Sequence, residues 1–459
     1  MYLTRWYTKP IREDKPIRED KPIREDKPIR EDKPQQITIA SSQSNLSQFR
    51  DFLSHLATIK GDLSDVTAPP FLLSPTSVTE IPASWASRHE LFQQPAYEAD
   101  EAARALLVLK NFLCSLKPQL RTAADADGAP KKPLNAFLGE LFISEIGGGK
   151  GGSGSGSGSG STTTRVVAEQ VSHHPPVTAC AAYNLETGMS SCGYVAQETS
   201  FSPVWGVRVR QVGHAIIRDE RHRESHLRTL PTMAIKNLLT GAYAELEGVC
   251  HIVSSAGYVS TVEFTGRKTW RYSGGSRKNS VRAELARVPR DGQEKGEVLY
   301  EVAGQWSGRL TITECATGAV LEDFDVDDVP LSEVRTLPLE KQSPWESRRA
   351  WRGVAEGIRA GDMDRVHVEK KRIEEAQRQI RKAEKLIGIE WPTVFFRPVA
   401  ESAEFALLAR AIPDPAAREL ARDRTAGVWE FVGPGAAEAL ISEGVYHRAL
   451  EPTGQILSN

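Results

Sequence analysis

A long central stretch of the chain, from about residue 166 to 325, alternates apolar and polar residues with a period of two. Between 207 and 210 valines alternate with arginines, and the same texture returns at 258–264 and 298–302. Successive side chains of a strand point to opposite faces, so this period is typical of strands that bury one face. Turns rich in glycine and serine separate the runs. These features together predict a large antiparallel sheet or barrel.

Helical periodicity flanks this central region. Apolar residues recur every three to four positions over 47–59, over 101–118, where the stripe ends near Pro118, and over 346–387, which is richly charged from 366 onward. This spacing places the apolar residues on one face of a helix. The chain is therefore predicted to be an α+β protein in which helices accompany one large sheet.

Two low-complexity stretches interrupt the globular pattern. Residues 9–34 repeat the hexapeptide Lys-Pro-Ile-Arg-Glu-Asp four times, and 147–161 are almost pure glycine and serine. A proline at every sixth position excludes a helix, and four charges around a single isoleucine leave too little to bury. We expect 1–40 to form a disordered tail and 41–459 a single domain, with 147–161 as a flexible loop inside it.

Composition excludes several classes of function. The formal net charge of −2 offers no basic surface for nucleic acid. The five cysteines are scattered, without a Cys-x-x-Cys pair, and no His stands beside them at metal-ligand spacing. The chain shows neither a signal-peptide pattern nor an apolar run of 18 residues. We expect a cytoplasmic protein that needs no metal or cofactor and contacts membranes only at their periphery.

Four sequence blocks resemble the oxysterol-binding protein family. The most specific, 169–177, reads Glu-Gln-Val-Ser-His-His-Pro-Pro-Val, and it is accompanied in order by 131–140, 304–308 and 346–351. The likeness is strongest to short fungal members that consist of the lipid-binding domain alone. It implies a near-complete antiparallel β-barrel around a hydrophobic tunnel, with an N-terminal lid at about 44–65 and flanking helices. The tunnel of such proteins holds a sterol or phosphatidylinositol 4-phosphate and exchanges them between organelle membranes.

The resemblance also implies a binding site, in two parts. The phosphoinositide headgroup site falls on Lys132, Asn135, His173, His174, Lys370, Glu374 and Arg378. Basic side chains suit a phosphate monoester because they donate charge-assisted hydrogen bonds, and the last three residues share one face of a helix. The sterol and lid residues are Phe49, Phe52, Leu53, Leu56, Ile59, Leu63 and Gln119, the last placed near the sterol hydroxyl.

Other interpretations of these residues remain open. The apolar stripe at 47–59 is also typical of an ordinary core helix. The charged run after 366 is also typical of a solvated helix face, and Gln119 is also typical of a residue that caps a helix. Leu120 stands where the family usually has an aromatic residue, and Ala136 replaces a proline. An enzyme is not expected, because no Gly-x-Ser-x-Gly motif surrounds Ser172. The alternatives to lipid exchange are a lipid-dependent sensor or regulator without net transport, and transfer of another phospholipid such as phosphatidylserine.

Overall fold

The structure is a computed structural model that describes most of the chain after residue 36. The described residues are 37–59, 63, 66, 68–125, 128–148, 162–239, 241–265, 278–289, 296–447 and 451–453. The chain divides into two compact units, Met1–Ser47 and Gln48–Asn459. Of the tail expected at 1–40, residues 1–36 lie outside the described residues, and 37–40 already belong to a helix that begins at Ile37. Of the Gly/Ser loop expected at 147–161, residues 149–161 lie outside them as well. The second unit contains every strand that the structure describes.

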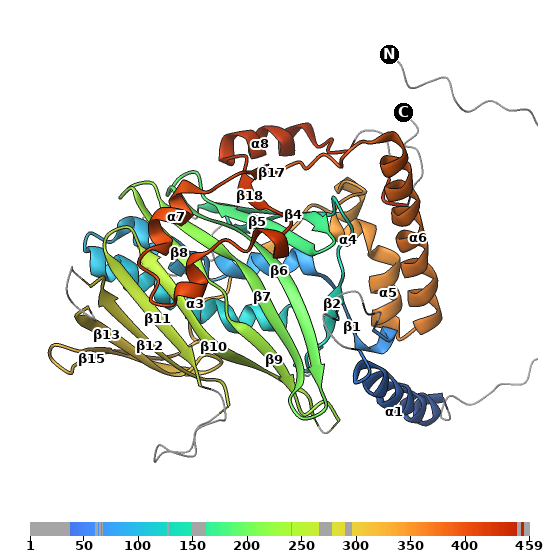
Figure 1. Ribbon diagram of the computed structural model, residues 1–459, viewed down its shortest axis with the longest axis horizontal. Helices are drawn as coiled ribbons and strands as arrows, with labels where there is room; N and C mark the ends of the chain where they lie inside the picture. The colour runs from blue at the N-terminus through green and yellow to red at the C-terminus, as the bar shows by residue number, and fades with distance from the viewer. Residues whose placement is uncertain are drawn as a thin grey trace, which may run out of the picture. The chain divides into compact units, whose positions relative to one another are not determined.

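One large, predominantly antiparallel sheet dominates this unit (Figure 1). Its strands follow the order β15-β14-β13-β12-β11-β10-β8-β7-β6-β5-β4-β3-β16, and β9 pairs with β7 and β10. Neighbours in sequence are mostly neighbours in the sheet, as short hairpin connections require. The strands are β3 (Leu141–Gly147), β4 (Thr163–His173), β5 (Pro176–Tyr183), β6 (Met189–Ser202), β7 (Gly206–Asp219), β8 (Glu224–Thr229), β9 (Thr232–Lys236), β10 (Tyr243–Ser254), β11 (Tyr258–Phe264), β12 (Ser280–Arg287), β13 (Val298–Gln305), β14 (Arg309–Glu314), β15 (Val320–Asp325) and β16 (Val334–Arg335).

The antiparallel sheet with accompanying helices confirms the α+β expectation, whereas the strands that the structure describes do not form a closed ring. β15 and β16 end the strand order, and they do not pair with each other within the described part of the chain. Two small sheets complete the set of strands. They join β1 (Leu73–Ser77) to β2 (Lys132–Leu134) and β17 (Phe396–Val399) to β18 (Val428–Phe431).

The predicted helices are present with altered limits. The stripe at 47–59 belongs to α1 (Ile37–Leu56), and that at 101–118 to α3 (Glu101–Arg121). Pro118 does not end α3: the carbonyl of Cys114, which its missing N–H leaves free, accepts a hydrogen bond from Arg88 Nε at 3.4 Å. The remaining helices are η1 (Pro70–Leu72), η2 (Val78–Ala86), α2 (His89–Gln93), η3 (Gln94–Tyr97), η4 (Leu339–Lys341), α4 (Ser347–Ala350), α5 (Arg352–Ala360), α6 (Met363–Ile387), α7 (Ala403–Ala409), η5 (Pro415–Arg418), η6 (Arg422–Arg424) and α8 (Pro434–Glu443).

The region predicted as one helix over 346–387 is split into α4, α5 and α6. Gly361 ends α5 with φ at 69°, a conformation that glycine adopts without steric cost. The Asp362 side chain then accepts from the N–H of Arg365 at 3.0 Å and begins α6. α5 and α6 pack side by side as a result (Figure 1).

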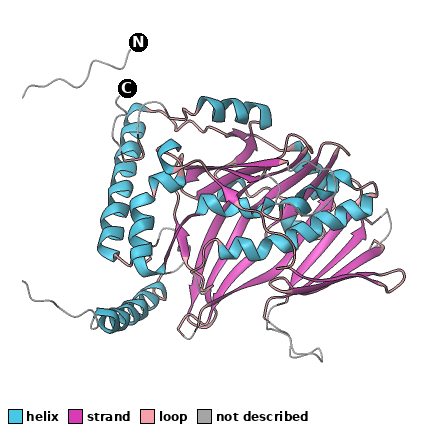
Figure 2. Cartoon of the chain, turned by 180° about the vertical axis from the view of Figure 1, so that it is seen from behind, coloured by secondary structure: helices cyan, strands magenta, loops and turns pink. Residues whose placement is uncertain are grey.

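Both faces of the sheet around β4 and β5 are buried, each against a different set of elements. Val166, Ala168 and Cys180 belong to the core that contains η2 and α3, which lie across one face of the sheet (Figure 2). Val167 and Ala181, one position away, belong to a second core with the C-terminal segment. The period of two assigns alternate residues to the two cores, as expected for a covered strand.

The C-terminal segment after Trp391, whose sequence is weakly patterned, is the cover of this second face. The fully buried carboxylate of Glu169 on β4 accepts from the N–H groups of Val394 and Phe395 at 2.7 and 2.8 Å. Trp391 packs over Gly139, where an added Cβ would lie 2.4 Å from the indole nitrogen. Only glycine leaves room for that ring.

A second buried carboxylate, that of Glu140, connects three separate segments. Thr79 at the start of η2 donates to it at 3.0 Å, and the indole N–H of Trp351 donates at 2.7 Å. Ser77 and the N–H of Phe137 donate as well. Burial raises the pKa of Glu140, and these donors oppose that rise. Such a residue stabilises the fold because all its donors would lack an acceptor without it.

We expect Glu140→Ala to lower the free energy of unfolding by about 3 to 5 kcal/mol, because it leaves several buried donors unpaired. Trp351→Phe removes one donor and should cost about 1 to 3 kcal/mol. Urea unfolding followed by circular dichroism measures both. Equal and small losses in the two variants would contradict a central role for this carboxylate.

Glu169 makes the stability depend on pH. Burial raises the pKa of its carboxyl to about 7, above the ordinary value, so the folded state holds its proton up to a higher pH than the unfolded state. The free energy of unfolding should therefore fall, by up to about 3 kcal/mol from this residue, as the pH rises from 4.5 to 7. The side chain of the Glu169→Gln variant cannot ionise, so it does not share this loss. The difference in free energy of unfolding between the wild type and the variant should therefore become smaller between pH 4.5 and pH 7. A gap that is constant from pH 5 to pH 8 would contradict the assignment.

Candidate functional site

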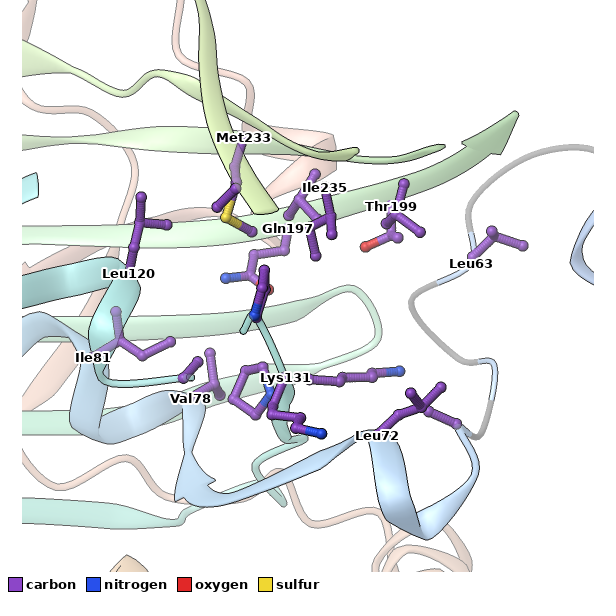
Figure 3. A pocket seen from close by; sticks show the side chains of 18 of the residues that line it. Leu63, Leu72, Val78, Ile81, Leu120, Lys131, Gln197, Thr199, Met233 and Ile235 are labelled. Carbon is purple, nitrogen blue, oxygen red and sulfur yellow. The ribbon is translucent and has the colours of Figure 1, made fainter. Parts of the chain in front are cut away.

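A cavity of about 380 Å³ lies between α1, the end of α3, η2 and the strands β6, β7, β9 and β10. Its size falls in the usual range of small-molecule sites. Met233 and Ile235 project from the sheet, and Val78 and Ile81 face them from η2 (Figure 3). Most of the lining is apolar, as a site for an apolar ligand requires.

The predicted lid residues form one wall of this cavity. Phe49, Phe52, Leu53, Leu56 and Leu63 all line it, whereas Ile59 does not. Leu56 and Leu63 are buried, so this wall is already packed.

The chain just after α1 is tied to the sheet. The N–H of Leu63 donates to the carbonyl of Thr199 on β6 at 2.7 Å. The ring of Phe49 meets that of Phe71, with centroids 6.4 Å apart. The predicted lid residues therefore contact the rest of the unit through a backbone hydrogen bond to β6 and through a ring contact with Phe71.

Polar groups line the cavity at a few points only. Gln119, in the last turn of α3, lines the cavity, and its side chain forms no hydrogen bond with any residue that the structure describes. Gln211 donates to the carbonyl of Pro231 at 2.8 Å, and Gln170 accepts from Thr178 at 2.7 Å. The amide of Gln119 is thus available to a ligand hydroxyl, whereas the amides of Gln170 and Gln211 are already engaged.

Lys131 and Lys132 are the charged members of the lining, and no carboxylate accompanies them among the described residues. Lys132 Nζ donates to the carbonyl of Val66 at 2.9 Å. Lys131 Nζ donates to the carbonyl of Phe71 at 3.3 Å and lies 3.5 Å from Asp125. Asn135, exposed, lines the cavity close by in sequence. This part of the wall favours an anionic group.

The two histidines lie next to this basic wall but do not line the cavity. His173 ends β4, and its Nδ1 lies 3.2 Å from the carbonyl oxygen of Ala136, the residue after Asn135. The ring of His174 meets that of His173 with centroids 4.6 Å apart, and His174 is exposed. The turn between β4 and β5 therefore brings both rings beside the block at 131–140.

The three predicted residues of α6 share a helix face and contact one another. Glu374 pairs with Lys370 and lies 3.9 Å from Arg378. They do not line the cavity, but α6 packs against η1, whose Leu72 does. Arg378 is 68% exposed, so its guanidinium is open to solvent.

The sequence motifs did not identify the polar residues that the strands contribute. Gln197 and Thr199 follow Val195 at intervals of two on β6, and all three line the cavity. The same interval places Gln211 beyond Val207 and Val209 on β7. The strand period identifies these positions once the inward face is known. Nothing in the sequence distinguishes that face when the residues on it are polar.

Comparison with known proteins identifies the family. The family model for oxysterol-binding protein matches residues 52–356. The chain is 37% identical over 398 residues to the probable transporter efuK of Hormonema carpetanum, covering 86% of this chain but only 54% of that protein. It is 38% identical over 364 residues to protein KES1 of Mycosarcoma maydis, covering 78% of this chain and 90% of that protein.

Solved structures share the fold. The ORD domain of Osh1 in complex with ergosterol matches with a TM-score of 0.61 at 19% identity, covering 87% of this chain and 90% of that one. The ORD of Osh3 from Saccharomyces cerevisiae in complex with PI(4)P matches with a TM-score of 0.58 at 19% identity, over 87% and 93%. Within the described residues, no helix has the length and apolar character needed to span a bilayer. By family model and by sequence identity to its relatives, the chain belongs to the oxysterol-binding protein family.

Proposed function

We propose that this protein binds a sterol or phosphatidylinositol 4-phosphate in the cavity beneath α1 and exchanges the two lipids between membranes. One observation carries the proposal: an apolar cavity has a wall with two lysines and no carboxylate among its described residues. The solved relatives named above hold ergosterol in one case and PI(4)P in the other. The sheet would curve around the ligand as an incomplete barrel, with α1 as the lid.

The energetics of this cavity favour exchange over permanent retention. Burying a sterol removes several hundred Å² of apolar surface from water, which is worth on the order of 10 kcal/mol at about 25 cal/mol per Å². A bilayer removes the same apolar surface from water equally well, so the free energy of moving a sterol from the bilayer into the cavity is close to zero. Occupancy then depends on the few polar contacts, and two ligands that compete for one cavity can replace each other.

The two ligands use different polar groups. A sterol offers one hydroxyl, which the amide of Gln119 can bind. A phosphate monoester needs several cationic donors, and Lys132, His173 and His174 surround the place where it would lie. Lys370, Glu374 and Arg378 would complete this headgroup site from α6, with Glu374 orienting its two basic neighbours.

We expect His173→Ala combined with His174→Ala to weaken binding of phosphatidylinositol 4-phosphate by at least about tenfold, because each lost charged hydrogen bond costs about 1.5 to 3 kcal/mol. Sterol affinity should stay near that of the wild type. Titration with liposomes that contain each lipid measures both affinities. His367→Ala, an exposed histidine on α6, is the matched control. Equal loss of both lipids in a folded double variant would contradict the headgroup assignment.

Charged substitutions on α1 test whether this helix closes the cavity. Phe52→Asp with Leu56→Asp places two carboxylates against an apolar cavity and should speed dissociation of a fluorescent sterol by at least about tenfold. Ser54→Asp with His55→Asp adds the same charges to the exposed face of α1 and should leave dissociation unchanged. Stopped-flow measurement of sterol release compares the two pairs. Similar rates in both would show that α1 is an ordinary core helix.

Transfer between two liposome populations separates lipid exchange from its alternatives. An exchanger moves sterol one way and phosphatidylinositol 4-phosphate the other, whereas a sensor binds without net movement. Including phosphatidylserine as a third cargo tests that ligand in the same assay. Binding without transfer would favour a lipid-dependent regulator.

A further inference from the structure

A second, larger cavity of about 1240 Å³ lies outside the first cavity, which is the proposed lipid tunnel. The end of α3, η2, the segment 327–342 and the helices α4 and α5 form its walls. No residue lines both cavities, although α3 and η2 contribute to each. On α3, Leu116, Gln119 and Leu120 face the tunnel, while Lys117 and Arg121 face the second cavity.

Positive charge is in excess around this cavity. Its lining contains four carboxylates, those of Glu80, Asp327, Glu333 and Glu356. It contains six cationic side chains, those of Arg88, Lys117, Arg121, Arg348, Arg352 and Arg359. Six against four leaves two positive charges without a counterpart. The chain as a whole has a net charge of −2, so this excess is local.

The existing ion pairs leave particular cations unneutralised. Lys117 holds Asp327 at 2.5 Å, and Arg348 holds Glu80 at 2.8 Å. The side chains of Arg121 at the end of α3 and Arg359 at the end of α5 form no ion pair or hydrogen bond within the described part of the chain, although the charge of Arg121 acts on Asp327. Both are exposed to the solvent that fills the cavity. Each therefore retains its full set of donors.

Arg88 adds a buried charge to the same wall. Only 4% of its surface is exposed, and its hydrogen-bond acceptors are two backbone carbonyls, those of Cys114 and Val329. Burial lowers the pKa of Arg88, nearby Cys114 and Asp327 oppose that change, and the charge of Arg121 lowers the pKa further. Asp327 also faces Lys117 and Arg121, so one carboxylate serves three cations. A buried cation with so little compensation is costly, and an anion at the cavity surface would offset that cost.

We propose that this second cavity binds a ligand with two or more phosphate groups. Guanidinium groups match phosphate oxygens with paired hydrogen bonds, and each phosphate monoester carries nearly two negative charges. The unneutralised arginines stand on two walls, α3 and α5, so separate phosphates on one molecule can reach both. A soluble inositol polyphosphate and the headgroup of a polyphosphorylated inositol lipid share this chemistry. This proposal does not rest on the lipid exchange proposed above.

The test uses the full chain with the tunnel headgroup site disabled by His173→Ala and His174→Ala. Calorimetric titration with soluble inositol 1,4,5-trisphosphate then measures binding with the first headgroup site weakened, and the arginine variants assign what remains. Arg121→Gln with Arg359→Gln should weaken this binding by at least about tenfold. Arg210→Gln with Arg410→Gln removes two exposed arginines outside both cavities and should change it less than about twofold.

A vesicle arm separates the two sources of the ligand. Vesicles that contain phosphatidylinositol 4,5-bisphosphate present the same headgroup on a lipid. If Arg121→Gln with Arg359→Gln reduces both vesicle binding and soluble binding, the site takes a membrane headgroup. If it reduces only soluble binding, the ligand is a free inositol polyphosphate. The proposal would be overturned if the parent protein did not bind inositol 1,4,5-trisphosphate. It would also be overturned if the Arg121/Arg359 variant and the Arg210/Arg410 variant bound it with equal affinity.

Discussion

The buried carboxylate of Glu140 is the interaction on which the position of the tunnel wall depends. It accepts hydrogen bonds from Thr79 near the start of η2 and from Trp351 just before α5. Between them these contacts fix η2 against the sheet, and η2 supplies Val78 and Ile81 to the tunnel. A carboxylate at this point costs free energy through its burial, but it specifies one arrangement of three segments that are far apart in sequence.

The sequence predicted the sheet and the main helices because both depend on local periodicity. The alternation on β6 and β7 and the stripe of α3 are visible without any knowledge of the partner surface. The contacts of Glu140 and Glu169 are not visible in this way, since Trp351 and Val394 lie more than 200 residues further on and Thr79 lies 61 residues before Glu140. The C-terminal cover escaped recognition for the same reason: backbone N–H groups of Val394 and Phe395 hold it, and these carry no sequence signal.

The candidate site was predictable where a compact motif carries it. The block at 131–140 and the histidine turn lie together, as their shared family motif implied. The lid stripe likewise lines the cavity, apart from Ile59. The polar strand residues Gln197 and Gln211 were missed because an inward-facing glutamine has no signature of its own. The cluster of arginines around the second cavity was missed because it joins α3 to α5, more than 200 residues apart.

The end of α3 acts as a partition one helix thick, with Gln119 on one side and Arg121 on the other. A ligand that shifted this turn would change the volume of both compartments at once. Thermodynamic linkage would then make the effect reciprocal, because each ligand would change the affinity for the other by the same factor. A partition one helix thick therefore offers a direct physical route between two compartments that share no lining residue.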